Sequence, residues 1–274
     1  MVQRKLFKQA KHRHNMAWNI FKRGEKPKLG FVSFTGCQGC QFSILFVDDI
    51  LTLLKKFDVK YFHLLKEKNK ETDFDLLFVE GAVTTKKQVK KLKALRKKTK
   101  FLVAFGTCAT HGGIPAMRNF LDKNELKKYT YSQKLSKDSI DAAPVEKYIK
   151  VDYFMYGCPV IKKEFVTFLK QFLKKKQIKE CETPVCLECP RKGKKCYLLE
   201  KKPCLGAITH GGCNALCIRN NHICTACRGP LKNANFAGEI ALFKNMGLSE
   251  KDIKNKLNRY INNEKNNTKP HNKN

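Results

Sequence analysis

The sequence contains few acidic residues and no long apolar run. Among its 274 residues there are 24 Asp and Glu against 56 Lys and Arg. No apolar stretch approaches the roughly 18 to 20 residues that a membrane-spanning helix needs. The N-terminal residues are basic, but no apolar signal core follows them and they contain no twin-arginine pair. We therefore predict no membrane span and no signal peptide, and we expect a cytoplasmic protein.

The shortage of acidic residues leaves a formal net charge of +32. Such an excess raises nucleic acid as a possible partner, because Lys and Arg neutralise phosphates. The lysines, however, are spread along helical patterns at 86–100 and 168–177 and along the C-terminal tail, and no motif that reads nucleic acid is present. This distribution favours a general lysine bias, or an acidic protein partner, over a nucleic-acid-binding surface.

Cysteine, in contrast, is abundant. The chain has thirteen, and eight of them fall within residues 186–227. Thiols stay reduced in the cytosol, so cysteine clusters there are more often metal ligands or redox groups than disulfides. The odd number also argues against a framework made only of disulfides.

Residues 29 to 180 alternate apolar and helical patterns, which predicts an α/β fold with a mostly parallel sheet. Strands are expected at 29–36, 59–65, 75–83, 100–106 and 151–157, and helices at 40–56 and 161–176. The first helix should pack one apolar face on the sheet, through Phe42, Leu45, Phe46, Ile50, Leu53 and Leu54. Beyond about residue 180 the regular pattern stops, and so few apolar runs remain that something other than a core must stabilise the segment.

Four well-separated cysteines follow predicted strands: Cys37, Cys40, Cys108 and Cys158. The carboxyl ends of parallel strands share one edge of a sheet, so we expect these thiols to converge there. Four thiolates suit a four-iron, four-sulfur (4Fe4S) cluster or a tetrahedral zinc ion. Buried thiols without a metal are the alternative, although packing alone does not predict such a convergence.

The eight clustered cysteines divide by spacing into two sets of four, and each set contains a C-x-x-C pair. One set is Cys186, Cys189, Cys196 and Cys204, and the other is Cys213, Cys217, Cys224 and Cys227. Metal-ligand bonds would supply the folding free energy that apolar residues here do not. Zinc and iron-sulfur clusters both remain open from spacing alone. Cys181 is left over and is interpreted as a non-ligand.

Several motifs in combination resemble the small, electron-transferring subunit of nickel-iron hydrogenases: TGCQGC, VEGAV, GTCATHGGIPAMRN, GCPV, CLECPR, CLGAITHGGCNALC and CTACRGP. The similarity runs from about residue 29 to 231. It is greatest for the cytoplasmic group 3 type, especially the methyl-viologen-reducing hydrogenases of methanogens. The segment between Cys189 and Cys196 is shorter than in those subunits, GCPP has become GCPV, and the surface is more basic.

The resemblance implies a flavodoxin-like domain followed by a small irregular iron-sulfur lobe, with a basic extension at 1–28, the domain at 29–180, the lobe at 181–248 and a Lys/Asn-rich tail at 249–274. It also implies three 4Fe4S clusters. The strand-end cysteines match the proximal cluster, the set that begins at Cys213 matches the medial cluster, and the set that begins at Cys186 matches the distal cluster. Cys186 replaces the His of periplasmic relatives, and Cys217 replaces a Pro, so both outer clusters are expected to be full cubanes.

As such a subunit, the chain would carry electrons between the large subunit, which holds the catalytic nickel-iron site, and a flavin or iron-sulfur acceptor subunit. No catalytic residue is expected here, because nothing resembles the paired CxxC ligands of nickel. The alternatives are an electron-transfer subunit of another oxidoreductase, similar to one in respiratory complex I, and a zinc-binding nucleic-acid protein.

Four polar residues beside these motifs have open roles. Glu80 is either a hydrogen-bonding neighbour of the proximal cluster or a carboxylate at a helix start or turn. His111 and His210 are expected to face solvent more often than to contact a cluster. Arg118 either ties its loop to the large subunit, as the resemblance suggests, or forms an exposed salt bridge.

Overall fold

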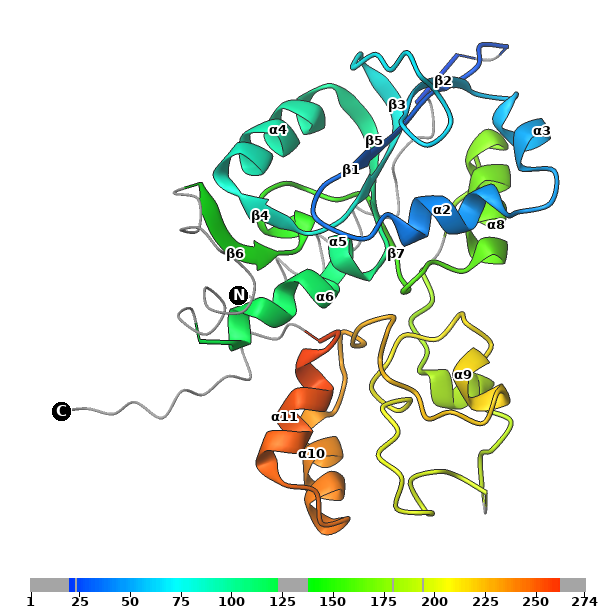
Figure 1. Ribbon diagram of the computed structural model, residues 1–274. Coiled ribbons are helices and arrows are strands. Elements are labelled where there is room, and N and C mark those ends of the chain that lie inside the picture. The colour runs from blue at the N-terminus through cyan, green and yellow to red at the C-terminus, as the bar shows by residue number, and fades with distance from the viewer. Residues whose placement is uncertain (1–19, 23, 123–137, 179, 194, 262–274) are drawn as a thin grey trace, which may run out of the picture.

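A five-stranded parallel sheet forms the centre of the first domain (Figure 1). The computed structural model describes residues 20–22, 24–122, 138–178, 180–193 and 195–261. In their order across the sheet, the strands are β2 (Asp58–Phe62), β1 (Lys28–Ser33), β3 (Phe74–Glu80), β5 (Thr99–Phe105) and β7 (Tyr153–Met155). Numbered along the chain, this order is 2-1-3-4-5, the arrangement of flavodoxin-like folds. All five predicted strands, the α/β class and the flavodoxin-like sheet are therefore confirmed.

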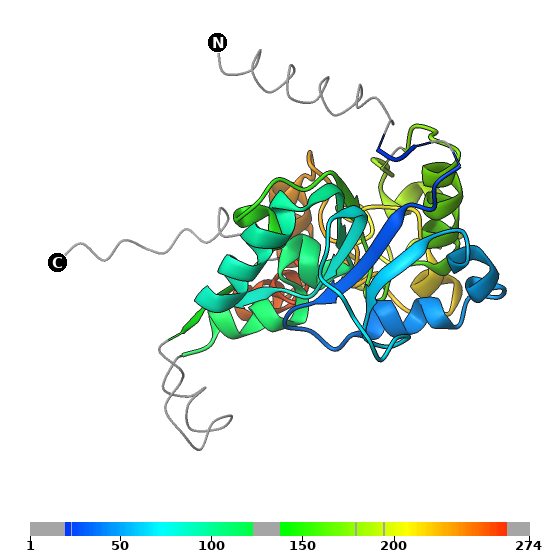
Figure 2. The same ribbon diagram turned by 90° about the horizontal axis from the view of Figure 1, so that it is seen from above.

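Helices cover both faces of the sheet (Figure 2). One face packs against α2 (Gly39–Leu45), α3 (Ile50–Leu54) and α8 (Lys162–Leu173), and the other against α4 (Lys86–Lys97) and α5 (Thr107–His111). Every residue of β3 is buried, as expected for a central parallel strand covered on both sides. Stacked aromatic rings fill the first face, where Phe78 lies 4.7 Å from Phe31 and 5.5 Å from Phe165 between ring centroids.

The helix predicted over 40–56 is interrupted. It divides into α2 and α3, and Asp49, at the start of α3, adopts left-handed backbone angles with φ of 57°. Phe42 and Phe46 are consequently 56% and 61% exposed, and their rings contact each other edge to face at 5.1 Å. The expectation that both rings pack on the sheet is wrong. Because α2 ends at Leu45 and α3 begins only at Ile50, residues 40–56 do not form one helix with a continuous apolar face. The other four apolar residues do pack against the core (Leu45, Ile50, Leu53 and Leu54). The second predicted helix is confirmed as α8.

A small antiparallel pair, β4 (Val83–Thr85) and β6 (Ser139–Ala143), was not predicted. It packs beside α6 (Gly113–Ala116) and the 3-10 turn η1 (Met117–Phe120). Arg118 of η1 donates hydrogen bonds to the carbonyl oxygens of Thr84 and Ile140, one on each side of the pair. Arg118 therefore ties two parts of its own chain together rather than forming an exposed salt bridge. A second 3-10 turn, η2 (Val145–Lys147), leads toward β7.

The C-terminal lobe lies below the sheet in Figure 1 and contains η3 (Val185–Glu188), α9 (Leu216–Arg219), α10 (Phe236–Asn245) and α11 (Glu250–Asn258). Two small apolar clusters stabilise it. One surrounds Tyr197 and Ile218 among the cysteines, and the other joins α10 and α11 through Phe243 and Ile253. The expectation that apolar packing is lacking here is therefore wrong in part, since α10 and α11 supply a core that the sequence pattern did not reveal. Among the helices of the described ranges, none combines the length and apolarity needed to cross a bilayer.

Candidate functional site

The first group of thiols lies where three strands end. Cys37 and Cys40 follow β1, Cys108 lies in α5 after β5, and Cys158 follows β7. Burial raises the pKa of the Cys40 thiol, and negative charges on Glu80, Cys108 and Cys158 raise it further. Burial also raises the pKa of Cys108 to about 12, with contributions from the charges of Cys158 and Cys37. Sγ of Cys40 lies 4.0 Å from the carbonyl oxygen of Gly157, the residue before Cys158, so thiols from separate strands converge at this edge of the sheet.

Glycine permits the close approach of backbone to this group. Gly106 has φ of 82°, a conformation that residues with a side chain rarely adopt. A Cβ atom at this position would also collide with Sγ of Cys40. The glycine that precedes Cys108 is thus required both by the turn and by the neighbouring thiol.

Glu80, at the end of β3, caps the helix that carries Cys40. Its two carboxylate oxygens accept hydrogen bonds from the backbone N–H groups of Cys40 at 3.0 Å and Gln41 at 3.2 Å. Burial raises the pKa of Glu80, and these two N–H groups oppose that rise. The residue therefore fulfils both roles considered for it: it is a helix-start carboxylate and a hydrogen-bonding neighbour of a thiol site.

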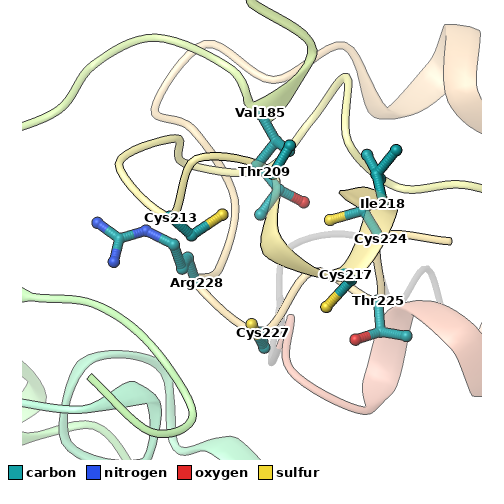
Figure 3. Close-up of a pocket in the computed structure, with 10 residues that line it drawn as sticks. Val185, Thr209, Cys213, Cys217, Ile218, Cys224, Thr225, Cys227 and Arg228 are labelled. Carbon is teal, nitrogen blue, oxygen red and sulfur yellow. The ribbon is translucent and has the colours of Figure 1, made fainter. Parts of the chain in front are cut away.

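The second group of thiols lines a pocket in the lobe. The pocket has a cavity volume of only about 20 Å³, and its lining includes Cys213, Cys217, Cys224 and Cys227. In Figure 3 the four sulfur atoms surround the centre of the pocket and point toward one another, whereas the Arg228 guanidinium points away. Val185 and Thr209 form the apolar wall beside them. Four sulfur donors are therefore directed into one small pocket.

The third group of thiols comprises Cys186, Cys189, Cys196 and Cys204. Burial raises the pKa of Cys186 to about 11, and charges on the other three thiols raise it further. The backbone approaches this group closely at Gly206, where a Cβ atom would lie 3.4 Å from Sγ of Cys186. The same Cβ position would lie 3.7 Å from Sγ of Cys204, so Cys186 and Cys204 lie against one short stretch of backbone.

The three groups follow one another through direct neighbours. The backbone N–H of Cys224 donates to Sγ of Cys204 at 3.3 Å, which joins the second group to the third. Burial raises the pKa of Cys227 to about 11, the Cys158 backbone N–H opposes this rise, and the Cys158 charge adds to it. Cys158 and Cys227 thus join the first group to the second. The second group therefore neighbours both the first and the third, and we refer to this succession as a row.

Within the described ranges, no three His, Cys, Asp or Glu side chains lie close enough to hold a single metal ion. A four-iron cluster imposes a different spacing. Each of its cysteines binds a different iron atom at a corner of the cube, so the sulfur atoms stand farther apart than around one tetrahedral ion. The sulfurs of the pocket in Figure 3 point inward, which is the orientation that such a group requires of its four donors.

Buried polar contacts of Arg228, Glu164 and Tyr156 join the domain to the lobe; we call them the seam. Arg228, next to Cys227, is 1% exposed and pairs through both terminal nitrogens with the Glu164 carboxylate of α8, at 2.8 and 3.3 Å. It also donates to the carbonyl oxygen of Tyr156 at 2.9 Å. The Tyr156 ring stacks on His210 at 4.2 Å between centroids, with His111 on another side at 5.6 Å. Sequence reasoning identified the two histidines but missed the role of Arg228, Glu164 and Tyr156.

The two histidines are interior rather than solvent-facing. His210 is buried, His111 is half-buried, and burial lowers the pKa of both. The Nδ1 atom of His210 lies 2.9 Å from the carbonyl oxygen of Cys181. The Cys181 thiol itself contacts the Thr183 hydroxyl at 3.3 Å. The expectation of solvent-facing histidines is therefore wrong, because the lobe covers them.

Comparison with known proteins assigns the family. Residues 37–172 match the family described as NADH ubiquinone oxidoreductase, 20 Kd subunit. The chain is 34% identical to the sulfhydrogenase 2 subunit delta of Pyrococcus furiosus, over 84% of this chain and 97% of that protein. It is 30% identical to one subunit of the F420-non-reducing hydrogenase vhu of Methanocaldococcus jannaschii, over 74% of this chain and 81% of that protein.

Solved structures of hydrogenase chains share this fold. A [NiFeSe] hydrogenase chain from Desulfomicrobium baculatum superposes with a TM-score of 0.55 at 18% identity, and the match covers 80% of this chain and 99% of that one. A [NiFeSe] hydrogenase chain from Desulfovibrio vulgaris Hildenborough gives a TM-score of 0.53 at 18% identity, over 79% and 97%. At this identity the likeness concerns the fold alone. The sequence matches establish that the chain belongs to the small subunits of group 3 nickel-iron hydrogenases, the electron-transferring component of an oxidoreductase complex.

Proposed function

We propose that this small subunit relays electrons through three 4Fe4S clusters between a nickel-iron site on a separate large subunit and a redox partner. The proximal cluster would be held by Cys37, Cys40, Cys108 and Cys158. The medial cluster would be held by Cys213, Cys217, Cys224 and Cys227, and the distal cluster by Cys186, Cys189, Cys196 and Cys204. When bound, each cluster supplies one-electron redox chemistry at cysteine-ligated iron.

The observation that carries this proposal is the row of three four-thiol groups, in which Cys158 neighbours Cys227 and Cys224 neighbours Cys204. A relay requires centres in succession, each near the next. Separate zinc sites, which take no part in redox chemistry, require no such succession. The row is therefore a specific argument for electron transfer over a purely structural use of the twelve thiols.

The protein's own residues would determine how readily each site takes up an electron. Burial of Cys40 and Cys224 disfavours negative charge, whereas N–H groups directed at sulfur stabilise it. Two such donors are the Arg191 N–H, 3.4 Å from Sγ of Cys189, and the Cys224 N–H beside Cys204. Arg228 lines the medial pocket, but its guanidinium is directed at the Glu164 carboxylate, which offsets its charge.

The remaining parts of the proposal follow from family membership. The large subunit would cover the face near the proximal thiols, and a flavin or iron-sulfur acceptor would receive electrons from the distal end. We also propose a cytoplasmic location and a division into a domain at 29–180 and a lobe that begins at 181 and, because α11 packs against α10, extends beyond the predicted end at 248.

Metal analysis after anaerobic purification tests the cluster assignment. About twelve iron and twelve sulfide per chain are expected for three cubanes. Cys→Ser at Cys40, at Cys217 or at Cys196 should each remove about four iron, one variant for each group. Cys181→Ser is the matched control, since its thiol belongs to no group, and it should retain the full iron content. Stoichiometric zinc in a colourless protein would contradict the proposal and favour the zinc-binding alternative.

Hydrogen-dependent dye reduction tests the relay. The complex of this chain with its large subunit should reduce methyl viologen under hydrogen, and the Cys40→Ser variant should lose that activity. An iron-rich protein that co-purifies with no hydrogen-activating partner would instead support the second candidate, an electron-transfer subunit of another oxidoreductase. The family description that names NADH ubiquinone oxidoreductase is the observation that keeps this candidate in view.

A further inference from the structure

A buried hydroxyl group connects the first thiol group to the second. Thr107 immediately precedes Cys108 and is 1% exposed. Its Oγ1 donates a hydrogen bond to the carbonyl oxygen of Cys227, 120 positions further along the chain. This single bond therefore links the neighbour of a first-group thiol to the backbone of a second-group residue, across the boundary between domain and lobe.

The domain fixes Thr107 through two strand ends. Its backbone N–H donates to the carbonyl oxygen of Gly157 at 2.9 Å, and the N–H of Gly106 donates to the carbonyl oxygen of Met155 at 2.8 Å. Thr107 thus lies between the end of β5 and the end of β7, the strands that lead to two thiols of the first group. The position of its hydroxyl group is set by the same backbone that positions these two thiols.

The other end of α5 contacts the same turn of the lobe. Gly229 has φ of 73°, and a Cβ atom there would collide with the ring of His111, the last residue of α5. The Gly229 N–H donates to the carbonyl oxygen of Ala226 at 2.8 Å, which closes a turn that contains Cys227. Thr107 and His111 are four positions apart and therefore lie on one face of α5. Two contacts on this face, one at each end of the helix, thus support the turn that carries Cys227.

Thr110, in the same helix, provides a comparison. Its Oγ1 bonds locally, to the carbonyl oxygen of Thr107 at 3.5 Å and to Nδ1 of His111 at 2.8 Å. Bonds to nearby backbone are the common use of a threonine hydroxyl group in a helix. The Thr107 hydroxyl group instead leaves its helix and satisfies a carbonyl group of the lobe. It therefore stabilises the contact between the two thiol groups rather than α5 itself.

We propose that Thr107 is a positioning residue that holds the second thiol group against the first and so determines how fast an electron passes between them. This inference rests on the proposed function, because it requires redox centres at both groups. Oxidation of H2 to two protons on the large subunit supplies two electrons, which pass one at a time. One electron leaves the reduced centre at the first group, which is thereby oxidised, and reduces the oxidised centre at the second. No covalent bond forms or breaks in this step, and no proton moves.

The Thr107 hydrogen bond favours this step in two ways. One peptide bond leads from Cys108 to Thr107, and the hydroxyl group of Thr107 leads to Cys227, so bonded atoms replace a gap between the two ligands. An electron tunnels faster through bonded atoms than across an equal gap, because the barrier is lower. The bond also fixes the distance between the two groups, and small displacements of reacting groups change rates steeply.

Substitution of Thr107 in the intact hydrogenase complex tests the proposal. Thr107→Val keeps the shape of the side chain and removes the hydrogen bond, while the pair of Arg228 and Glu164 keeps the lobe attached. After rapid mixing with H2, freeze-quench electron paramagnetic resonance should show the first centre reduced as fast as in the wild type and the second centre reduced about tenfold more slowly. Iron content and both midpoint potentials should be unchanged, because the lost bond involves no thiol. Thr107→Ala, which removes the same hydroxyl group, should give the same delay, and Thr107→Ser, which keeps it, should restore the wild-type rate.

Thr99→Val is the matched control. Thr99, at the start of β5, is also buried, and its hydroxyl group donates to the carbonyl oxygen of Leu95 at 2.7 Å, within the domain. This variant should reduce both centres at the wild-type rates. Wild-type rates in the Val and Ala variants of Thr107, an equal delay in the Thr99 variant, a delay that persists in the Ser variant, or a delay accompanied by loss of iron or a shifted potential would overturn the proposal. A wild-type complex with no iron or no dye reduction would instead show that the proposed function itself has failed.

Discussion

The two regions of this molecule present cysteine in opposite ways. The domain supports four thiols on a sheet that has 22 buried residues on one face, Cys40 among them, and 15 on the other, counted over the described residues. The lobe supports eight thiols on two clusters of six buried residues each, and two of those residues are themselves the thiols Cys204 and Cys224. In the domain the apolar core is large enough to position the thiols, whereas in the lobe the thiols make up a third of one small core. We therefore expect folding of the lobe to depend on a bound group more than folding of the domain does.

Removal of iron should produce the largest difference in stability between the domain and the lobe. In an iron-free chain we expect amide hydrogen exchange in 181–227 to rise at least a hundredfold, about 3 kcal/mol, because the bound clusters would supply much of the folding free energy there. Exchange in β3 and β5 should change little, because their residues are buried by the apolar core. Equal loss of protection in both regions, measured by mass spectrometry, would contradict this difference.

The seam between the regions should be the next most sensitive feature. Arg228→Met leaves the Glu164 carboxylate in a largely buried place without its cation, so the lobe should be destabilised by about 3 to 5 kcal/mol. Arg219→Met is the matched control, because Arg219 is exposed and bonds only to Asn214 within the described residues. Chemical denaturation would measure both variants. Adding Glu164→Gln to the Arg228 variant should recover part of the loss, and a failure to recover would show that the pair is not the cause.

The lobe should also respond to pH through Glu239 of α10. Burial raises its pKa to about 7 from 4.5, and its Oε1 atom has no hydrogen-bond partner among the described residues. The folded state then binds the proton more tightly than the unfolded state. The resulting stabilisation, up to about 3 kcal/mol, is complete below pH 4.5 and is lost as the pH rises through 7.

The Glu239→Gln variant should abolish this contribution, so its unfolding free energy should fall less than that of the wild type between pH 5 and 8. Glu250→Gln on α11 is the control, because that carboxylate is exposed and its pKa is lowered by Lys244. Unfolding at a series of pH values would measure the difference. If the wild type and the Glu239 variant have parallel pH profiles, this carboxyl group does not titrate as described.

The smallest effect is expected inside the domain. Glu80→Gln keeps one acceptor oxygen but loses the charged cap of α2, so we expect about 1 to 2 kcal/mol of destabilisation confined to that helix. Hydrogen exchange of α2 amides would report it, with Glu71→Gln, an exposed partner of Lys91, as the control. Loss of iron from the lobe in this variant would mean that the two regions are less independent than their cores suggest.

The sequence by itself determined the sheet and the grouping of its thiols by position. Apolar runs bounded by glycine specify buried strands such as β3, and the spacing of Cys186 from Cys189 requires a short loop with two thiols at its ends. Both are local properties, so they can be read along the chain. The helix from 40 to 56 was predicted wrongly at Asp49, because left-handed backbone angles at a residue other than glycine carry no clear sequence signal.

Only the tertiary structure decided which distant residues meet. Arg228 pairs with Glu164, 64 positions away, Glu80 caps a helix 40 positions earlier, and the Cys224 N–H reaches Cys204 of another thiol group. Each contact depends on how separate elements pack, and neither periodicity nor motif spacing encodes that packing. The lobe's own core has the same origin, because α10 and α11 bury Phe243 and Ile253 only when they face each other.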